Sequence, residues 1–207
     1  MTSKKYLSGS VFQFYIQQIN KYAFCQFYDF THLSDRGILA RSFDKFSDVE
    51  ENDLSYLSDA DWLFGHRIVC RWPFFRKGGS WKFLGVLLNE GLEFVPDFKG
   101  SLAFPPYVED ESTIDTWFPV FNLNKWGEPC PYEQVQHLEY DVRDSPSGLQ
   151  LRTGLEYCRL HQLDVKKHFT HKIQDRKPHL FHMNNVPMYK DIPKEKRGRA
   201  SVANRIQ

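Results

Sequence analysis

The chain has 207 residues, which is long enough for one large domain that buries a core without disulfides or metals. Aromatic residues make up 16% of it and charged residues 26%, which excludes a disordered chain and is typical of a folded globular protein. No apolar stretch approaches the roughly 20 residues of a membrane span, and the polar start 1–5 leads into no signal-peptide core, so we expect a cytoplasmic protein without membrane contact.

Two stretches near the start are rich in aromatic and β-branched residues. They cover residues 9–16 and 21–29, and the polar residues 17–20 join them. Such side chains suit the pleated surface of a strand, and polar residues suit a turn. The pattern predicts an antiparallel β-hairpin.

A turn at residues 35–37 precedes a third stretch of strand type, residues 38–43, which would extend the hairpin into a meander. Cap-forming residues at 51–53 then stand ahead of Leu54 and Leu57. The i,i+3 spacing of these two leucines predicts one or two helical turns.

Two further strands are predicted at residues 66–72 and 81–88. Pro73 should end the first strand because proline has no amide hydrogen to donate to a ladder, and the Gly-Gly step within 77–80 favours a reversal between the two. We expect both strands to lie in the centre of the sheet. Prolines and glycines interrupt residues 89–131, where the aromatic residues indicate irregular loops pinned by buried rings.

The clearest helix start is Ser145–Pro146. Ser145 can accept a hydrogen bond from the first free backbone amides, and Pro146 suits the first helical position. Beyond them, one largely apolar face recurs at spacings of three and four, through Leu151, Leu155, Cys158, Gln162, Val165 and Phe169. Gly154 weakens a helix by about 1 kcal/mol relative to alanine, so one helix or two shorter pieces fit the pattern.

These elements predict a β-dominated α+β fold. We expect an antiparallel twisted sheet, a C-terminal helical segment and an extended basic tail. The single β-rich globular domain is placed at residues 1–177 and the tail at residues 178–207, where the periodic pattern fades.

The four cysteines, Cys25, Cys70, Cys130 and Cys158, lie far apart and include no Cys-x-x-Cys pair. We therefore expect free thiols rather than a disulfide framework. Cys25 and Cys70 fall in apolar strand patterns, where a cysteine usually acts as a small buried hydrophobe.

The net charge of +1 hides a segregated distribution, with acids concentrated in residues 29–61 and bases in the last fifth of the chain. A carboxylate surface that carries aromatic side chains suits a basic protein partner, because charge complementarity speeds encounter and aromatic rings supply contact area. The residues predicted to contact a partner are Asp44, Asp48, Glu50, Glu51, Asp53, Tyr56, Asp59, Asp61 and Trp62. An ordinary acidic surface whose aromatic residues are buried in the core explains the same pattern.

The late histidines are the best candidate metal ligands. They occur at i,i+3 spacing, which places two imidazoles on one helix face. The pairs are Cys158 with His161, His168 with His171, and His179 with His182. No carboxylate is spaced as in the helices of zinc hydrolases, and surface histidines are the competing interpretation.

A magnesium-dependent nuclease would use Glu109–Glu111 with Asp115, because clustered carboxylates bind this ion; a solvated acidic loop is the alternative. The chain contains no dinucleotide fingerprint, phosphate loop or Gly-x-Ser-x-Gly elbow, so we expect no cofactor and no catalysis. The basic stretch from Lys190 to Arg205 could contact phosphates, but it lacks the aromatic platforms of single-strand binders. We therefore do not expect nucleic acid to be the partner.

Several of these stretches together resemble immunity family twenty-six of the bacterial polymorphic-toxin systems. The similarity spans roughly residues 9–155 and rests mainly on hydrophobic and glycine positions. The matching stretches are residues 9–12, 21–27, 81–85, 137–140 and 145–149.

This resemblance implies a mostly β protein that binds a cognate toxin and blocks it by occlusion. The expected function is therefore that of an immunity protein, or antitoxin, with no chemistry of its own. A metal-dependent hydrolase or nuclease, and a nucleic-acid-binding module built on the basic tail, remain the alternatives.

Overall fold

An antiparallel hairpin forms the centre of the protein, as the sequence predicts. The computed structural model describes residues 8–72, 81–87, 94–102, 114–169, 180 and 182–202. Strand β1 (Ser10–Ile16) pairs with β2 (Lys21–Asp29) in a register that sets Phe12 opposite Cys25. Asn20 has a φ of 52° in the connecting turn, a conformation that asparagine tolerates.

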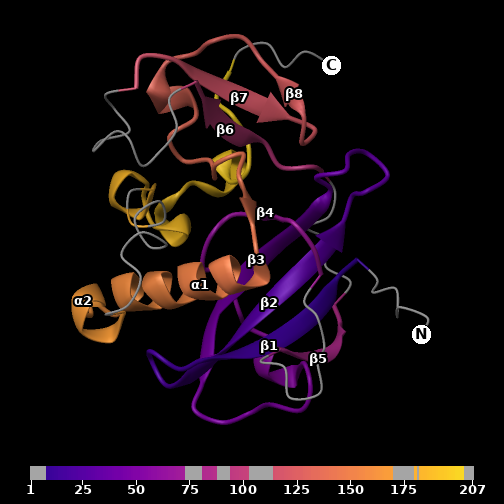
Figure 1. The fold of residues 1–207 in the computed structure, drawn as a ribbon, viewed down its shortest axis with the longest axis vertical. Helices are drawn as coiled ribbons and strands as arrows, with labels where there is room; N and C mark the ends of the chain where they lie inside the picture. The colour runs from indigo at the N-terminus through magenta and orange to yellow at the C-terminus, as the bar shows by residue number, and fades with distance from the viewer. Residues whose placement is uncertain are drawn as a thin grey trace.

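The hairpin belongs to a six-stranded main sheet with the strand order β5-β1-β2-β3-β4-β9. The further strands are β3 (Ile38–Ser47), β4 (Arg67–Val69), β5 (Trp81–Val86) and β9 (Arg143–Asp144). Neighbouring strands are antiparallel except for β4 and β9, which are parallel. Figure 1 shows the long strands β1, β2 and β3 side by side.

The expectation that the strands at 66–72 and 81–88 are central is wrong. β5 lies at one end of the strand order, and β4 is a three-residue strand next to the terminal β9. β2 and β3 take the two middle positions, and β1 beside them is buried along almost its whole length, whereas Phe83 in β5 is 41% exposed. The predicted reversal at 77–80 lies outside the described residues.

Helix α1 (Pro146–Leu160) begins where the sequence predicts. The Ser145 hydroxyl accepts a hydrogen bond from the Gly148 amide at 3.0 Å. The helix ends before Gln162, whose φ of 54° breaks the repeat, and α2 (Val165–His168) is a separate turn. The sequence predicts a possible break at Gly154, whereas α1 runs unbroken through Gly154 and the interruption falls at residues 161–164.

The main core lies between α1 and one face of the main sheet (Figure 1). Phe12, Phe14 and Phe27 on the sheet pack with Leu149 and Leu155 of the helix. The opposite face carries Val11, Phe24 and Phe43, which are covered by the chain between β3 and β4. That chain includes the predicted helical turn, a 3-10 helix at Ser55–Leu57.

A second, three-stranded sheet lies beyond the end of the main sheet (Figure 1). It contains β6 (Phe98–Ser101), β7 (Trp117–Phe121) and β8 (Lys125–Trp126), in that order. The sequence predicted irregular loops here, and the buried aromatics Trp117 and Phe121 are instead part of an ordered antiparallel ladder. Phe98 and Val120 join this sheet to Tyr28, Leu39 and Ile68 of the main sheet.

The chain after α2 differs from the expected extended tail. Residues 182–185 are helical, and two 3-10 helices follow at Tyr189–Asp191 and Lys194–Lys196. This segment lies between α1 and the small sheet, where Met183, Ile192 and Ala200 are buried (Figure 1). These apolar side chains, together with backbone hydrogen bonds such as Asp97 N to Gly198 O, hold the described part on the body of the protein.

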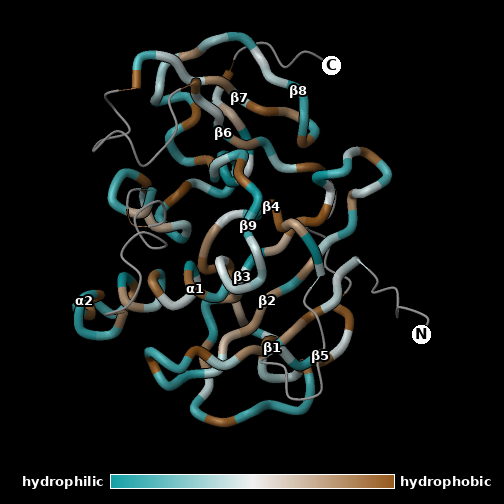
Figure 2. Tube along the Cα trace, viewed as in Figure 1, coloured by the Kyte–Doolittle hydropathy of each residue, from teal (hydrophilic) through white to brown (hydrophobic). Residues whose placement is uncertain are grey.

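The structure confirms the predicted class, a β-dominated α+β fold. Figure 2 shows hydrophobic residues along the central strands and hydrophilic residues along the outer loops. Within the described part of the chain, no helix combines the length and the apolar character that crossing a bilayer requires.

Candidate functional site

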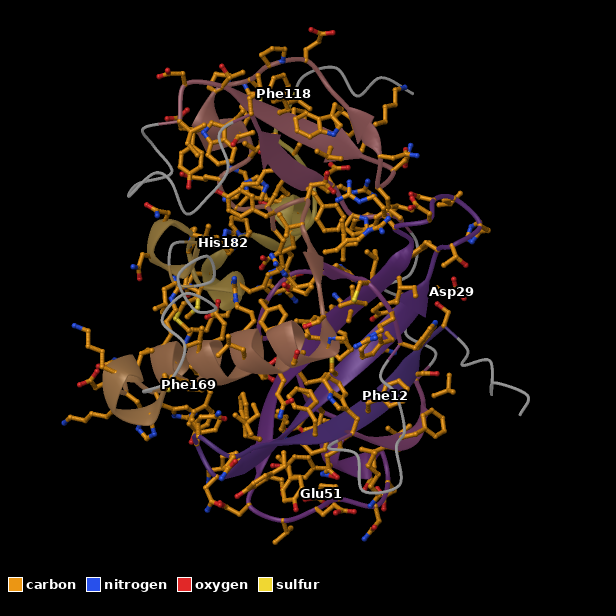
Figure 3. The ribbon with its side chains drawn as sticks, in the orientation of Figure 1. Phe12, Asp29, Glu51, Phe118, Phe169 and His182 are labelled. Atoms are coloured by element: carbon orange, nitrogen blue, oxygen red, sulfur yellow. The ribbon has the colours of Figure 1, made fainter. Side chains whose placement is uncertain are left out.

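Residues 44–61, here called the acidic segment, run from the end of β3 over the sheet face opposite α1. Leu57 of the segment is buried against this face, and the Leu54 side chain packs against Gly85 of β5. The Asp44 amide donates to the Asp61 carbonyl at 3.0 Å, which closes the segment back onto β3. Figure 3 places Glu51 at one end of the molecule and Phe118 of the small sheet at the other.

Six of the seven acids of the acidic segment are exposed. Glu51 is half-buried, and its carboxylate accepts a hydrogen bond from the Ser47 hydroxyl. The exposed members are Asp44, Asp48, Glu50, Asp53, Asp59 and Asp61. The structure therefore brings all seven predicted acids onto one continuous stretch of surface chain.

Three lysines from the underlying strands pair with these acids. Lys45 contacts Asp59 at 2.6 Å and Lys82 contacts Glu50 at 2.6 Å, while Lys21 pairs with Asp48. Ion pairs as exposed as these contribute little to stability, about 0–1 kcal/mol each. Arg197 of the C-terminal segment also lies 3.7 Å from Asp61, so four positive charges against seven negative ones leave this set with a net charge of −3.

Local hydrogen bonds favour the ionised carboxylates. The hydrogen bond from Lys45 lowers the pKa of Asp59, and hydrogen bonds from Ser55 lower the pKa of Asp53. Both groups are charged at neutral pH, so the segment keeps its negative charge there.

Tyr56 and Trp62, the two aromatic residues predicted to contact a partner, make contacts within the chain. The Tyr56 hydroxyl donates to the Phe46 carbonyl at 2.6 Å. Trp62 stacks on Phe43 with ring centroids 4.4 Å apart, and the Arg41 guanidinium lies 3.3 Å from the centroid on the Trp62 ring. These rings hold the acidic segment on the sheet, and Trp62 and Tyr56 remain half-exposed.

A second constellation, which the sequence analysis missed, is buried between the main sheet, α1 and the C-terminal segment. We call it the buried charge network. Its members are Arg67, Glu139, Asp144, Arg152, Glu156 and His182. Each side chain is no more than 9% exposed.

Glu139 lies in the middle of this network. Its carboxylate is 3.0 Å from Arg67, 3.5 Å from Arg152 and 3.0 Å from His182. Burial alone would raise the pKa of Glu139, but Arg152, His182 and Arg67 outweigh it and hold the pKa well below its usual range. Figure 3 shows His182 between α1 and the small sheet.

The described residues leave little space beside the buried charge network. A small void beside it, lined by His66, Asp97, His137, Glu139 and Tyr189, has a volume of about 10 Å³. A space of that size holds about one water molecule and no substrate. The network connects the main sheet, α1 and the C-terminal segment in the interior.

The structure separates the late histidines that it describes. His161 and His168 are on the α1–α2 end of the molecule, whereas His182 contacts Glu139 in the buried charge network. His171, His179 and the acids 109–111 lie outside the described residues. Over the described ranges, no three His, Cys, Asp or Glu side chains gather as metal ligands would.

The described bases of the C-terminal segment fall into two groups. Arg197 donates to the Ile192 carbonyl at 2.9 Å, and the Arg199 guanidinium lies 3.3 Å from the centroid of the Phe94 ring. These arginines make contacts within the protein. Lys190, Lys194 and Lys196 are exposed.

The cysteines are free thiols, as predicted. Cys25 and Cys158 are buried, and burial raises the pKa of Cys158 to about 11. Cys70 is exposed rather than buried because β4 ends at Val69, before it. Cys130 is half-buried beside β7.

Comparisons with protein-family models, with curated proteins and with solved structures found no match to this chain. The resemblance to the immunity family thus rests on the residues quoted for it and stays a prediction. The acidic segment lies at the surface, and the buried charge network lies in the interior.

Proposed function

We propose that the protein is an immunity protein, which binds a cognate bacterial toxin and inhibits it by covering part of its surface. It performs no catalysis in this role. The observation that carries the proposal is the acidic segment, in which seven carboxylates outnumber the three lysines and one arginine that pair with them and form a net negative surface. The sequence resemblance to immunity family twenty-six points in the same direction.

The fixed geometry of the acidic segment supports binding. Leu57 is buried, and Tyr56 and Trp62 are held by contacts with Phe46 and Phe43. A surface that is already ordered loses little conformational entropy on association. A partner therefore meets the carboxylates in a fixed arrangement.

The charge of the segment defines the partner. A net negative patch attracts a protein with a basic surface and raises its association rate, most strongly at low ionic strength. We propose that the toxin presents such a surface to the acidic segment, and that the two meet in the cytoplasm. A toxin that binds nucleic acid would carry a basic surface of this kind.

The proposal is tested by removing charge without changing shape. The variant Asp48→Asn/Glu50→Gln/Asp59→Asn loses three carboxylates whose ion pairs are exposed, so the fold should persist. The matched control Asp115→Asn/Glu133→Gln/Glu195→Gln removes three exposed acids elsewhere. The partner assayed is a candidate toxin encoded beside this protein, and stopped-flow or surface-binding kinetics give the association rate.

The acidic-segment variant should associate at least about tenfold more slowly than the parent at low salt, with a smaller difference at high salt. The control variant should differ by less than about twofold at the same net charge. Equal slowing by both variants would assign the effect to overall charge. No binding by the parent protein would refute the proposed function itself.

A further inference from the structure

A surface cavity of about 390 Å³ lies beside β7 and β8 of the small sheet. Its size is near the lower end of the range for small-molecule sites, roughly 300–1,000 Å³. Pro119 and Phe121 of β7 and Val202 of the C-terminal segment contribute apolar walls. The small sheet and Glu51 of the acidic segment lie at opposite ends of the molecule (Figure 3).

The walls of the cavity are held in place by backbone hydrogen bonds. The Gly127 amide donates to the Pro119 carbonyl at 2.8 Å, and the Cys130 amide donates to the Trp117 carbonyl at 2.9 Å. The Ser201 amide donates to the Gln134 carbonyl at 2.9 Å, which fixes the C-terminal wall. The cavity is therefore preformed, and a ligand would not have to order it.

Pro129 and Pro131 stiffen the loop that forms the outer wall. Proline fixes its own φ near −65° and restricts the residue before it. Because Cys130 stands between these two prolines, its half-buried thiol has a defined position in the wall.

The Glu128 carboxylate of the cavity favours ligands of positive charge. Among the described residues that line it, Glu128 alone has a charged side chain, and it is exposed. No ion pair of Glu128 is found among the described residues. A carboxylate at the mouth of an apolar cavity attracts a cation and repels an anion.

We propose that this cavity binds a small organic cation: an amine whose apolar body fills the space between Pro119, Phe121 and Val202 while its ammonium group meets Glu128. The proposal does not depend on the proposed immunity function. The Gln134 side chain also lines the cavity and can pair with a polar group of the ligand.

The thiol of Cys130 provides a site-specific readout. In a Cys70→Ser background, Cys130 is the remaining thiol with exposure, because Cys25 and Cys158 are buried. Iodoacetamide labelling of Cys130, followed by mass spectrometry, reports whether the cavity is occupied. The probes are cyclohexylmethylamine, the neutral cyclohexylmethanol and the anionic cyclohexanecarboxylate, which share one apolar body.

We expect cyclohexylmethylamine to bind with a Kd on the order of 1 mM, as its small number of atoms allows. At an amine concentration of about twice this Kd, the fraction of protein with an empty cavity falls to about one third, so the labelling of Cys130 should slow about threefold. The alcohol should protect less and the carboxylate least. The probes should not change the labelling of Cys70 in the parent chain.

Glu128→Gln tests the role of the charge. Glu128 is exposed, so this variant keeps the fold. In the variant, the amine and the alcohol should protect Cys130 from labelling to the same extent. The matched control Glu133→Gln alters an exposed acid that does not line the cavity, and should keep the preference for the amine. Absence of protection by all three probes, or equal protection by amine and carboxylate in the parent, would overturn the proposal.

Discussion

The Nε of Arg67 donates to the Oδ2 of Asp144 at 2.8 Å, and the two residues stand on the parallel strands β4 and β9. Both side chains are buried. Asp144 precedes the N-cap of α1, so this bond connects the main sheet to the start of the helix. The same guanidinium reaches Glu139, which makes Arg67 a central member of the buried charge network.

Replacement of Arg67 by methionine should destabilise the protein strongly. Arg67→Met keeps an unbranched apolar stem but leaves Asp144 and Glu139 without one of their cations. Removal of one member of a buried ion pair costs about 3–5 kcal/mol, because the remaining charge is buried without compensation. The free energy of unfolding in urea measures the loss.

Arg143→Met is the matched control for this substitution. Arg143 precedes Asp144 but pairs with Asp35 at the surface, where the two side chains are 40% and 82% exposed. Its loss should cost less than about 1 kcal/mol. A similar cost for both variants would mean that the buried charge network has no special role in stability.

Gly154→Ala should destabilise the protein even though alanine favours helix. A Cβ at this position would lie 2.5 Å from Cζ of the buried Phe169 ring and 3.1 Å from Cγ2 of Ile16. Overpacking typically costs about 1–3 kcal/mol, against about 1 kcal/mol gained in helix propensity. Thermal unfolding should show a lower Tm, and a rise in Tm would show that Phe169 can move aside without cost.

The stability of the protein should fall as pH drops below about 6.5. Burial lowers the pKa of His66 and of His137 in the folded state. The unfolded chain, with ordinary histidine pKa values near 6.5, therefore takes up protons first. Stability is complete above that pH and is lost progressively as pH falls toward the lowered pKa values.

Urea unfolding at several pH values between 7.5 and 5.5 measures this loss. His137→Gln should make the decline shallower, whereas the exposed His161→Gln should leave it unchanged. A stability that stays constant over this range in the parent protein would contradict the prediction.

The thiols should react in an order set by their burial. Cys70 is exposed and should react first with an aromatic disulfide reagent at pH 8, followed by the half-buried Cys130. With a pKa raised to about 11, Cys158 has a thiolate fraction on the order of one in a thousand at that pH. Cys158 and Cys25 should therefore react only on unfolding, and rapid reaction of four thiols in native buffer would contradict this order.

Features encoded by neighbouring residues could be predicted from the sequence. The hairpin follows from two stretches rich in aromatic and β-branched residues joined by the polar residues 17–20, and the start of α1 follows from Ser145 and Pro146. The exposure of the acidic segment was also predictable, because charged side chains rarely lose their hydration. The internal contacts of Tyr56 and Trp62 were not, since aromatic side chains suit both a core and an interface.

Features that depend on distant residues could not be predicted. β5 pairs with β1 across about seventy residues, and the order of strands depends on which of them buries both faces. Arg152 and Glu156 have the i,i+4 spacing of an ordinary surface pair on a helix. Only the packing of Arg67, Glu139 and His182 against them places that pair in the interior.

The parallel pairing of β4 with β9 also affects how the chain folds during synthesis. The first three strands of the meander can associate once residues up to Ser47 have left the ribosome, because their contacts are local. β4 must then wait for Asp144, 75 residues after Val69, which takes roughly 4–15 s at typical elongation rates of about 5–20 residues per second. Throughout this interval the edge of β4 is a vulnerable point for association with other nascent chains.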